Sequence, residues 1–133
     1  MSDGSCLCGA VQYRFSGEVE TLYFCHCQSC QKATSSAFNT AIVTDDESFG
    51  ITAGEELLKR YASSPGVYRH FCANCGSHIF SSRDAQKGVY RLRAGTLNKA
   101  IHPQQKIHIF AAEKASWDTI CDGGQIYAER PTS

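Results

Sequence analysis

The sequence predicts an all-β protein built from two packed sheets. Its periodic segments are short and rich in β-branched and aromatic residues, as strands are, and Gly, Asp, Ser and Pro stand between them as turn formers. Only residues 30–34 and short stretches after residue 103 have a pattern compatible with a helix. A chain of 133 residues can bury one core, so we expect a single domain over residues 1–133.

The expected strands follow one another along the chain. Residues 11–15 alternate strictly between apolar and polar side chains, as a half-buried strand does. Residues 45–46, 53–54 and 64–66 have the composition of turns and separate later segments. In order, the expected strands cover residues 11–15, 21–24, 38–43, 49–52, 57–62, 67–71, 79–81, 89–93 and 107–110.

The charge composition argues against several classes of partner. The 13 basic and 13 acidic residues balance and form no long run of either sign, so we expect no nucleic-acid partner. No apolar stretch approaches the length of a membrane span, and the N-terminal residues lack the regions of a secretory signal. We therefore expect no membrane partner and a location in the cytoplasm. A homodimer is left open.

Seven of the eight cysteines fall into three tight clusters, and this spacing is the most informative feature of the chain. Clustered thiols in loops are a common way to hold a tetrahedral zinc ion, which takes thiolate sulfur at about 2.3 Å. We therefore expect a zinc-stabilised two-sheet β-sandwich, tent-like in form, with its metal sites in the loops. The clusters are Cys6-x-Cys8, Cys25-His26-Cys27-x-x-Cys30 and Cys72-x-x-Cys75-Gly76.

The first and third clusters together supply four thiolates, enough to close a structural zinc site. The glycine after the last of these cysteines favours this interpretation, because it can adopt positive φ and let backbone N–H groups point at sulfur. A metal shared by the two clusters would cross-link the N-terminus to the centre of the chain. The expected ligands are Cys6, Cys8, Cys72 and Cys75.

The middle cluster, Cys25, Cys27 and Cys30, supplies three thiolates. Zinc held by three protein ligands keeps one coordination position for chemistry, so we expect a catalytic zinc here and two zinc ions per chain. The alternative is a second structural site closed by a distant histidine or by Cys121, or by His26 within the cluster. His26 lies between better ligands, and a role beside the metal or in proton handling is open to it. The lone Cys121 is more typical of a small buried residue.

Two redox interpretations compete with metal binding. In a reducing compartment clustered thiols are more often metal ligands than disulfides, and a bridge from Cys6 to Cys8 would close a small, strained ring. A redox dithiol at Cys72 and Cys75 would normally start a helix, whereas the flanking residues here have strand patterns. Metal binding is therefore the prediction.

A zinc ion with three thiolate ligands favours one kind of chemistry. Its net charge near −1 makes it a softer Lewis acid than a three-histidine site, and it suits a fourth thiolate from solution. Coordination lowers the pKa of that thiol and holds it as a nucleophile. The expected activity is therefore activation of a small thiol or thiol adduct rather than peptide hydrolysis.

These motifs resemble the glutathione-dependent formaldehyde-activating enzyme family, also named for centromere protein V. The resemblance covers nearly the whole chain and keeps the three cysteine clusters in order with their flanks. The matching segments are G-x-C-x-C-G-x-V-x-Y from residue 4, C-H-C-x-x-C-Q-K from residue 25, F-C-x-x-C-G-S from residue 71, A-G-T-L from residue 94, and H-I-F from residue 108 with the later Trp117.

The resemblance implies one zinc-binding domain of this type over residues 1–133, with a structural zinc at the outer four cysteines and a catalytic zinc at the middle three. In the family's founding activity the sulfur of glutathione takes the open zinc position, and formaldehyde adds to form S-hydroxymethylglutathione. A zinc-dependent carbon–sulfur lyase is thus implied, with glutathione or another small thiol as co-substrate and an aldehyde-type electrophile. Asn98 stands where the family commonly carries an acidic residue.

Two alternatives come from other classes of protein. One is a non-catalytic zinc-binding scaffold or interaction module whose middle site is closed by a fourth ligand, since fold and metal do not establish a reaction. The other is a methionine sulfoxide reductase on a similar β-scaffold. That reaction needs a redox-active cysteine outside the metal clusters, and Cys121 is the only candidate.

Overall fold

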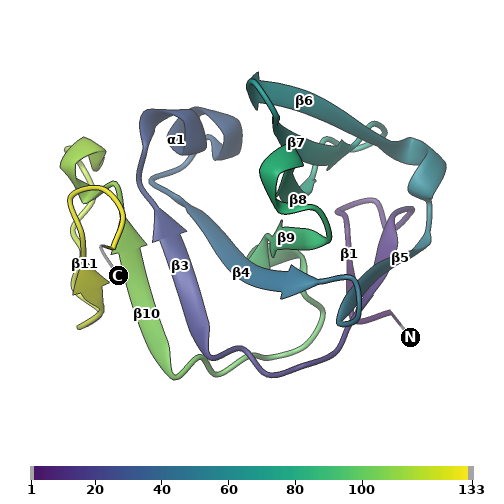
Figure 1. Cartoon of the computed structure of the whole chain (residues 1–133), viewed down its shortest axis with the longest axis horizontal. Coiled ribbons are helices and arrows are strands. Elements are labelled where there is room, and N and C mark those ends of the chain that lie inside the picture. Colours follow the sequence, from purple (N-terminus) through teal and green to yellow (C-terminus); the bar gives the residue numbers. More distant parts are fainter. Residues whose placement is uncertain (1, 132–133) are drawn as a thin grey trace. The chain divides into compact units, whose positions relative to one another are not determined.

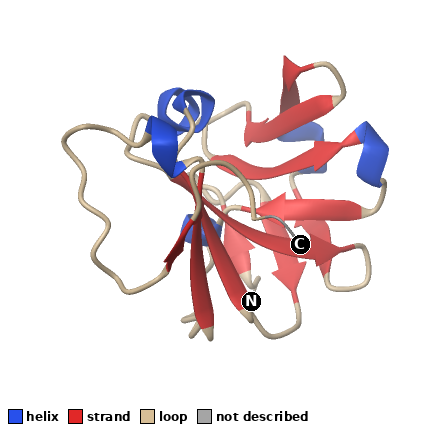
Figure 2. Cartoon of the chain, turned by 60° about the vertical axis from the view of Figure 1, so that its left-hand side comes forward, coloured by secondary structure: helices blue, strands red, loops and turns tan. Residues whose placement is uncertain are grey.

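The structure, a computed structural model, describes residues 2–131 of the chain. Within this range strands predominate and helix is confined to short segments, as Figure 2 shows. The strands form two sheets, so the all-β expectation is confirmed. The chain divides into two compact units. The first unit comprises the residues up to Glu18 and Ile42–Ile101, and the second unit comprises Val19–Ala41 and the residues from His102 onward.

The first unit contains a three-stranded sheet and most of the second sheet, and all of its neighbouring strands are antiparallel. The small sheet has the order β1 (Gly4–Ser5), β2 (Gln12–Phe15) and β5 (Phe49–Ala53). The strands of the second sheet that belong to this unit are, in order, the later part of β4 (Asn39–Asp45), β9 (Val89–Leu92), β8 (His78–Arg83), β7 (Val67–Cys72) and β6 (Leu58–Ser64).

The two sheets of the first unit pack together through aromatic side chains. Phe49 of β5 contacts Phe80 of β8 and Tyr90 of β9, with ring centroids 5.3 and 5.5 Å apart. Tyr13 of β2 is wholly buried, meets Phe49 edge-on at 5.3 Å and shares a 2.7 Å hydrogen bond with Thr96. Edge-to-face ring pairs of this kind contribute about 0.5–1.5 kcal/mol each beyond the area they bury. These rings form the core of the sandwich.

The second unit is built around β3 (Thr21–Cys25), the blue-violet strand to the left of β4 in Figure 1. On one side β3 pairs with the beginning of β4 in antiparallel fashion. On the other side it pairs in parallel with β10 (Gln105–Ile109), which in turn pairs in parallel with β11 (Gln125–Ile126). A parallel pair requires a long connection, and here that connection contains the whole later part of the first unit.

The remaining elements are short. The α-helix α1 (Gln28–Thr34) follows β3 after two residues. Within residues 2–131 no helix has the length and apolar character needed to span a membrane. The 3₁₀ turns are η1 (Glu55–Leu57), η2 (Asp84–Gln86), η3 (Ala94–Thr96) and η4 (Ala111–Glu113).

Every strand expected from the sequence is present, with its ends shifted by at most two residues. The helix expected over residues 30–34 begins at Gln28, because Cys27 caps it. Only β1 and β11 were not predicted, since a strand of two residues has no measurable periodicity. The expectation that residues 1–133 fold as one domain stays a prediction.

We expect Gly4→Ala to destabilise the first unit, because a Cβ atom at this position would overlap the ring of Tyr13. Tyr13 is buried and hydrogen-bonded, so the ring cannot move aside, and overpacking of this kind costs about 1–3 kcal/mol in the free energy of unfolding. Urea denaturation followed by circular dichroism measures the change. Gly95→Ala is the matched control, since a Cβ there would meet no atom within 4 Å. Equal stability of the two variants would contradict the prediction.

Candidate functional site

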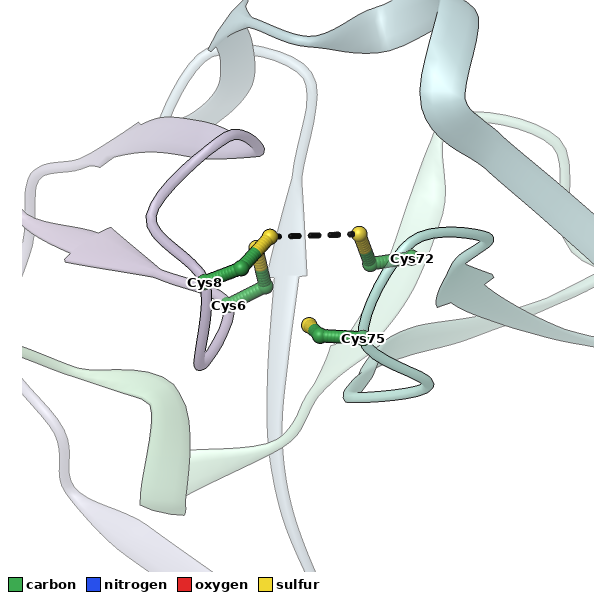
Figure 3. A group of neighbouring side chains, drawn as sticks. All are labelled: Cys6, Cys8, Cys72 and Cys75. Carbon is green, nitrogen blue, oxygen red and sulfur yellow. Dashed lines mark hydrogen bonds between the residues drawn. The ribbon is translucent and has the colours of Figure 1, made fainter.

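Two loops of the first unit bring four cysteine sulfur atoms together, as Figure 3 shows. Cys6 and Cys8 lie between β1 and β2, and Cys72 and Cys75 lie at the turn between β7 and β8. We call them the four-cysteine group. All four sulfur atoms lie within 4.8 Å of one another, with 3.5 Å from Cys6 to Cys8 and 3.9 Å from Cys8 to Cys72. Sulfur atoms at about 2.3 Å from a tetrahedral zinc are about 3.8 Å apart, so the group fits such a metal.

The two loops are built alike. Gly9 and Gly76 each follow the second cysteine of their pair, with φ of 79° and 82°. Their N–H groups return to the carbonyl oxygen of the first cysteine, at 3.1 Å from Gly9 to Cys6 and 2.7 Å from Gly76 to Cys72. A Cβ would meet no atom within 4 Å at either position, so glycine is required here for its backbone conformation rather than for space.

Hydrogen-bond donors surround the sulfur atoms of this group. The Val11 N–H donates to Cys6 Sγ at 3.3 Å. The Ser77 hydroxyl lies 3.3 Å from Cys75 Sγ, and with the Ser77 N–H it lowers the pKa of Cys75 to about 5. The same hydroxyl accepts from the Leu7 N–H at 2.9 Å and so joins the two loops. The two bonds from Ser77 favour the thiolate of Cys75, which is the form that a metal binds.

The other group lies in the second unit, where β3 ends and α1 begins. Cys25 is the last residue of β3, Cys27 is the N-cap of α1 and Cys30 lies in its first turn. We call them the three-cysteine group. Their sulfur atoms lie within 4.8 Å of one another, with 3.5 Å between Cys25 and Cys27. The chain remains extended at Cys27 (φ −64°, ψ 155°) and then turns into the helix, which is why this spacing brings three sulfur atoms together.

The three-cysteine group needs a compensating cation when it ionises. Contact with the sulfur atoms of Cys27 and Cys30, together with burial, raises the pKa of Cys25. The Cys30 N–H donates to Cys27 Sγ at 3.4 Å, which is the capping bond of the helix. A soft divalent metal is the natural counter-charge for such a set of sulfur ligands.

Asn39 is a supporting residue that the sequence analysis missed. Its Nδ2 donates to Cys30 Sγ at 2.8 Å from the beginning of β4, and only 4% of the residue is exposed. The signal was present in the sequence, because an amide stands near the start of a mostly apolar strand segment. A buried amide in that position needs a hydrogen-bond partner, and the sulfur atom is its partner here.

His26 and Cys121, the two alternative fourth ligands, have other surroundings. Among the described residues neither belongs to the three-cysteine group. His26 is wholly buried and its Nε2 lies 2.8 Å from Nδ1 of His108. Burial, and then the neighbouring His108, lower the pKa of His26. Cys121 is exposed, so the expectation of a small buried residue is wrong: it lies in a loop rather than in a strand. None of the eight cysteines, all of which the structure describes, forms a disulfide.

Comparisons with known proteins agree with the geometry. A family model described as glutathione-dependent formaldehyde-activating enzyme matches residues 1–113. An uncharacterised lyase of Schizosaccharomyces pombe is 33% identical over 92 residues, which are 69% of this chain and 65% of that protein. A Halomonas elongata protein, whose name assigns it provisionally to the glutathione-dependent formaldehyde-activating enzymes, is 25% identical over 126 residues, 89% of this chain and 80% of that protein.

Other relatives are longer than this chain. An Aspergillus flavus protein with the same provisional name is 27% identical over 77 residues, which are 56% of this chain and 40% of that protein. The matched region thus spans less than two thirds of the S. pombe and A. flavus proteins. A crystal structure of a Rhodobacter sphaeroides protein matches 73% of this chain and 88% of its own with a TM-score of 0.62 and 21% identity, which supports the fold.

We expect Cys72→Ser to abolish cooperative folding of the first unit. Binding of structural zinc contributes about 10–16 kcal/mol in zinc-finger peptides, which is as large as the whole stability of a typical domain. Thermal denaturation and zinc content of the purified protein are the measurements. Cys121→Ser removes an exposed cysteine outside both groups and is the control. A folded Cys72→Ser variant with unchanged zinc content would show that the four-cysteine group is not a structural metal site.

We expect Asn39→Ala to weaken zinc binding by the three-cysteine group alone. Loss of the bond to Cys30 Sγ should lower the affinity about 10-fold or more, as is typical of residues that support metal ligands. Competition with a chromophoric chelator for added zinc measures the affinity of each cysteine group. The control is Asn98→Ala, which removes an exposed amide of the first unit. Equal zinc affinity in both variants would contradict a supporting role for Asn39.

Proposed function

Because this chain belongs to the glutathione-dependent formaldehyde-activating enzyme family, we propose that it is a zinc-dependent carbon–sulfur lyase acting on a small thiol adduct. The thiol is glutathione or a similar molecule, and the electrophile is formaldehyde or another small aldehyde. The chain binds two zinc ions in this proposal. The four-cysteine group holds a structural zinc, and the three-cysteine group holds a catalytic one.

The proposal rests on the different number of sulfur atoms in the two cysteine groups. The four-cysteine group has a full set of sulfur ligands. The three-cysteine group gathers three, and within residues 2–131 no further His, Cys, Asp or Glu ligand atom joins it. Three protein ligands are typical of catalytic zinc sites, and four are typical of structural ones. Zinc held by three thiolates would supply a Lewis acid that lowers the pKa of an incoming thiol and favours its thiolate form.

The reaction itself needs no oxidant. The sulfur of the thiol forms a bond to the carbonyl carbon of the aldehyde while the π bond of the carbonyl group breaks. The thiol gives up one proton and the carbonyl oxygen gains one, so nothing is oxidised or reduced. The protein must therefore hold the thiolate in place and compensate its charge, rather than supply electrons.

The chain's own residues suit that task. Cys25, Cys27 and Cys30 lie within one strand end and one helix turn, so their positions are set locally. The Asn39 amide and the Cys30 N–H donate to two of the three sulfur atoms and take up part of their negative charge. Donors of this kind keep a sulfur-rich site from becoming too electron-rich to accept one more thiolate.

The proposal predicts that formaldehyde is consumed only when glutathione or a similar thiol is present. Cys30→Ser should lower the turnover by more than the roughly 10- to 100-fold that is typical when a residue merely supports a ligand. Cys121→Ser should leave turnover unchanged, since this exposed cysteine lies outside both groups. Turnover is followed by NMR of the S-hydroxymethyl product, and zinc content is measured on the same samples.

X-ray absorption at the zinc edge separates the proposal from a non-catalytic scaffold. Added glutathione should add one sulfur atom to the zinc of the three-cysteine group, so the average shell of the two zinc ions should gain about half a sulfur atom. If glutathione leaves the zinc ligands unchanged and no turnover is seen, the result would contradict the enzymatic proposal and support a non-catalytic scaffold. Turnover in a zinc-free protein would also contradict the proposal.

A further inference from the structure

Three polar side chains of the second unit form a hydrogen-bonded triad to which the proposed reaction assigns no role. His26 Nε2 lies 2.8 Å from His108 Nδ1, and His108 Nε2 lies 2.8 Å from Asp122 Oδ2. His26 is wholly buried, His108 is 3% exposed, and the Asp122 side chain is 26% exposed. The triad therefore connects the surface to His26, the residue between Cys25 and Cys27 of the three-cysteine group.

Packing against aromatic side chains fixes the two histidine rings of this triad. His108 stacks on Phe24 with centroids 4.6 Å apart and an angle of 19° between the planes, and His26 packs against Phe38 at 5.4 Å. The His26 backbone is held as well, because its N–H donates to Ile109 O at 3.0 Å and its carbonyl accepts from the Gln31 side chain at 2.7 Å. Neither ring can rotate to form a hydrogen bond with water. The donors and acceptors of the two rings must therefore be matched within the triad.

The proton positions follow from the carboxylate. A carboxylate oxygen only accepts, so Nε2 of His108 carries a proton, and in the singly protonated ring its Nδ1 has a lone pair. His26 must then donate through Nε2–H, which leaves its Nδ1 as a lone pair too. Among the described residues this Nδ1 has no hydrogen-bond partner. A buried acceptor without a partner is less unusual than a buried N–H without one, so the geometry favours this arrangement over the reverse.

The triad is connected to the cysteine sulfur atoms through the backbone. His26 is joined by peptide bonds to Cys25 and Cys27, and successive side chains of an extended segment point to opposite faces. A ring held on one face therefore sets the direction of the two cysteines on the other. Buried hydrogen bonds of this kind orient metal ligands in many proteins, and their loss weakens metal binding.

We propose that His108 and Asp122 are positioning residues for the three-cysteine group: they hold His26 in one tautomer and one orientation, and through it they fix the segment from Cys25 to Cys27 for the metal. This inference rests on the proposed function only in that the three cysteines hold zinc. It requires no particular thiol or aldehyde.

Asp122→Asn provides a sharp test, because Asp122 has two hydrogen-bond partners. Its Oδ1 accepts from the Gly124 N–H at 2.9 Å, while its Oδ2 accepts from His108. In the isosteric asparagine the oxygen should stay with the Gly124 N–H, so the NH₂ group faces His108 Nε2 and donates to it. The proton of His108 must then lie on Nδ1, and His26 Nε2 must accept from it. One substitution thus inverts both tautomers.

Long-range ¹H–¹⁵N NMR of the zinc-loaded, histidine-labelled protein reads tautomers directly. In the natural protein both His26 and His108 should carry their proton on Nε2, and in Asp122→Asn both should carry it on Nδ1. The inverted His26 would bury an N–H without a described acceptor, so zinc affinity at the three-cysteine group should fall about 10- to 100-fold. The four-cysteine group should keep its zinc.

Asp84→Asn is the matched control. It removes an equal charge from a carboxylate that accepts from the Tyr68 hydroxyl at 3.1 Å in the first unit. Tautomers and zinc affinity should both stay as in the natural protein. The spectrum of the natural protein tests the proton positions even if Asp122→Asn fails to fold.

The inference is overturned if His26 of the natural protein carries its proton on Nδ1, or if Asp122→Asn leaves the tautomers unchanged. Inverted tautomers with unchanged zinc affinity would also overturn it, since His26 would then not position the cysteines. Inversion together with the selective loss of zinc supports it. A protein that shows both effects but turns over no aldehyde would contradict the proposed function and leave this inference standing.

Discussion

Four sulfur atoms held in contact with one another constrain the whole first unit. Even in water two unit charges 4 Å apart interact by about 1 kcal/mol, and the energy rises in a less polar surrounding. Four thiolates with separations such as 3.5 and 3.9 Å would repel one another, and a cation between them would offset that repulsion. Such a cation would join loops whose cysteines are 64 positions apart, one beside the small sheet and one on the second sheet. The aromatic cluster around Phe49 already closes the sandwich, and a bound metal would close it a second time.

The two cysteine groups differ in how much of the chain must fold before they exist. The four-cysteine group needs two turns that are distant in sequence, and closing so long a loop has a substantial entropic cost. The three-cysteine group needs only the end of β3 and the first turn of α1. A metal at the local group would hold only a strand end and a helix turn, whereas a metal at the distant group would hold a long loop closed. This contrast is a reason to propose one structural and one reactive site.

The sequence predicted what depends on local pattern and missed what depends on pairing. Strand segments, the short helix and both sets of cysteines follow from periodicity and spacing, because each is encoded within a few neighbouring residues. Asn39 and the contact of His26 with His108 could not be found in this way. They depend on the register of β3 with β4 and β10, which places residues 9 and 82 positions apart in contact. Nothing in the spacing of the cysteines specifies that register.

The parallel pairing of β3 with β10 also has a consequence for synthesis of the chain. His108 follows His26 by 82 positions, so at about 5–20 residues per second the ribosome makes the cysteine segment roughly 4–16 s before the strand that packs beside it. During that interval the three thiols lack the strand that later pairs with β3. A metal bound by the three-cysteine group at that stage would therefore bind before His108 is in place, whereas a metal bound later would meet a segment that His108 already holds.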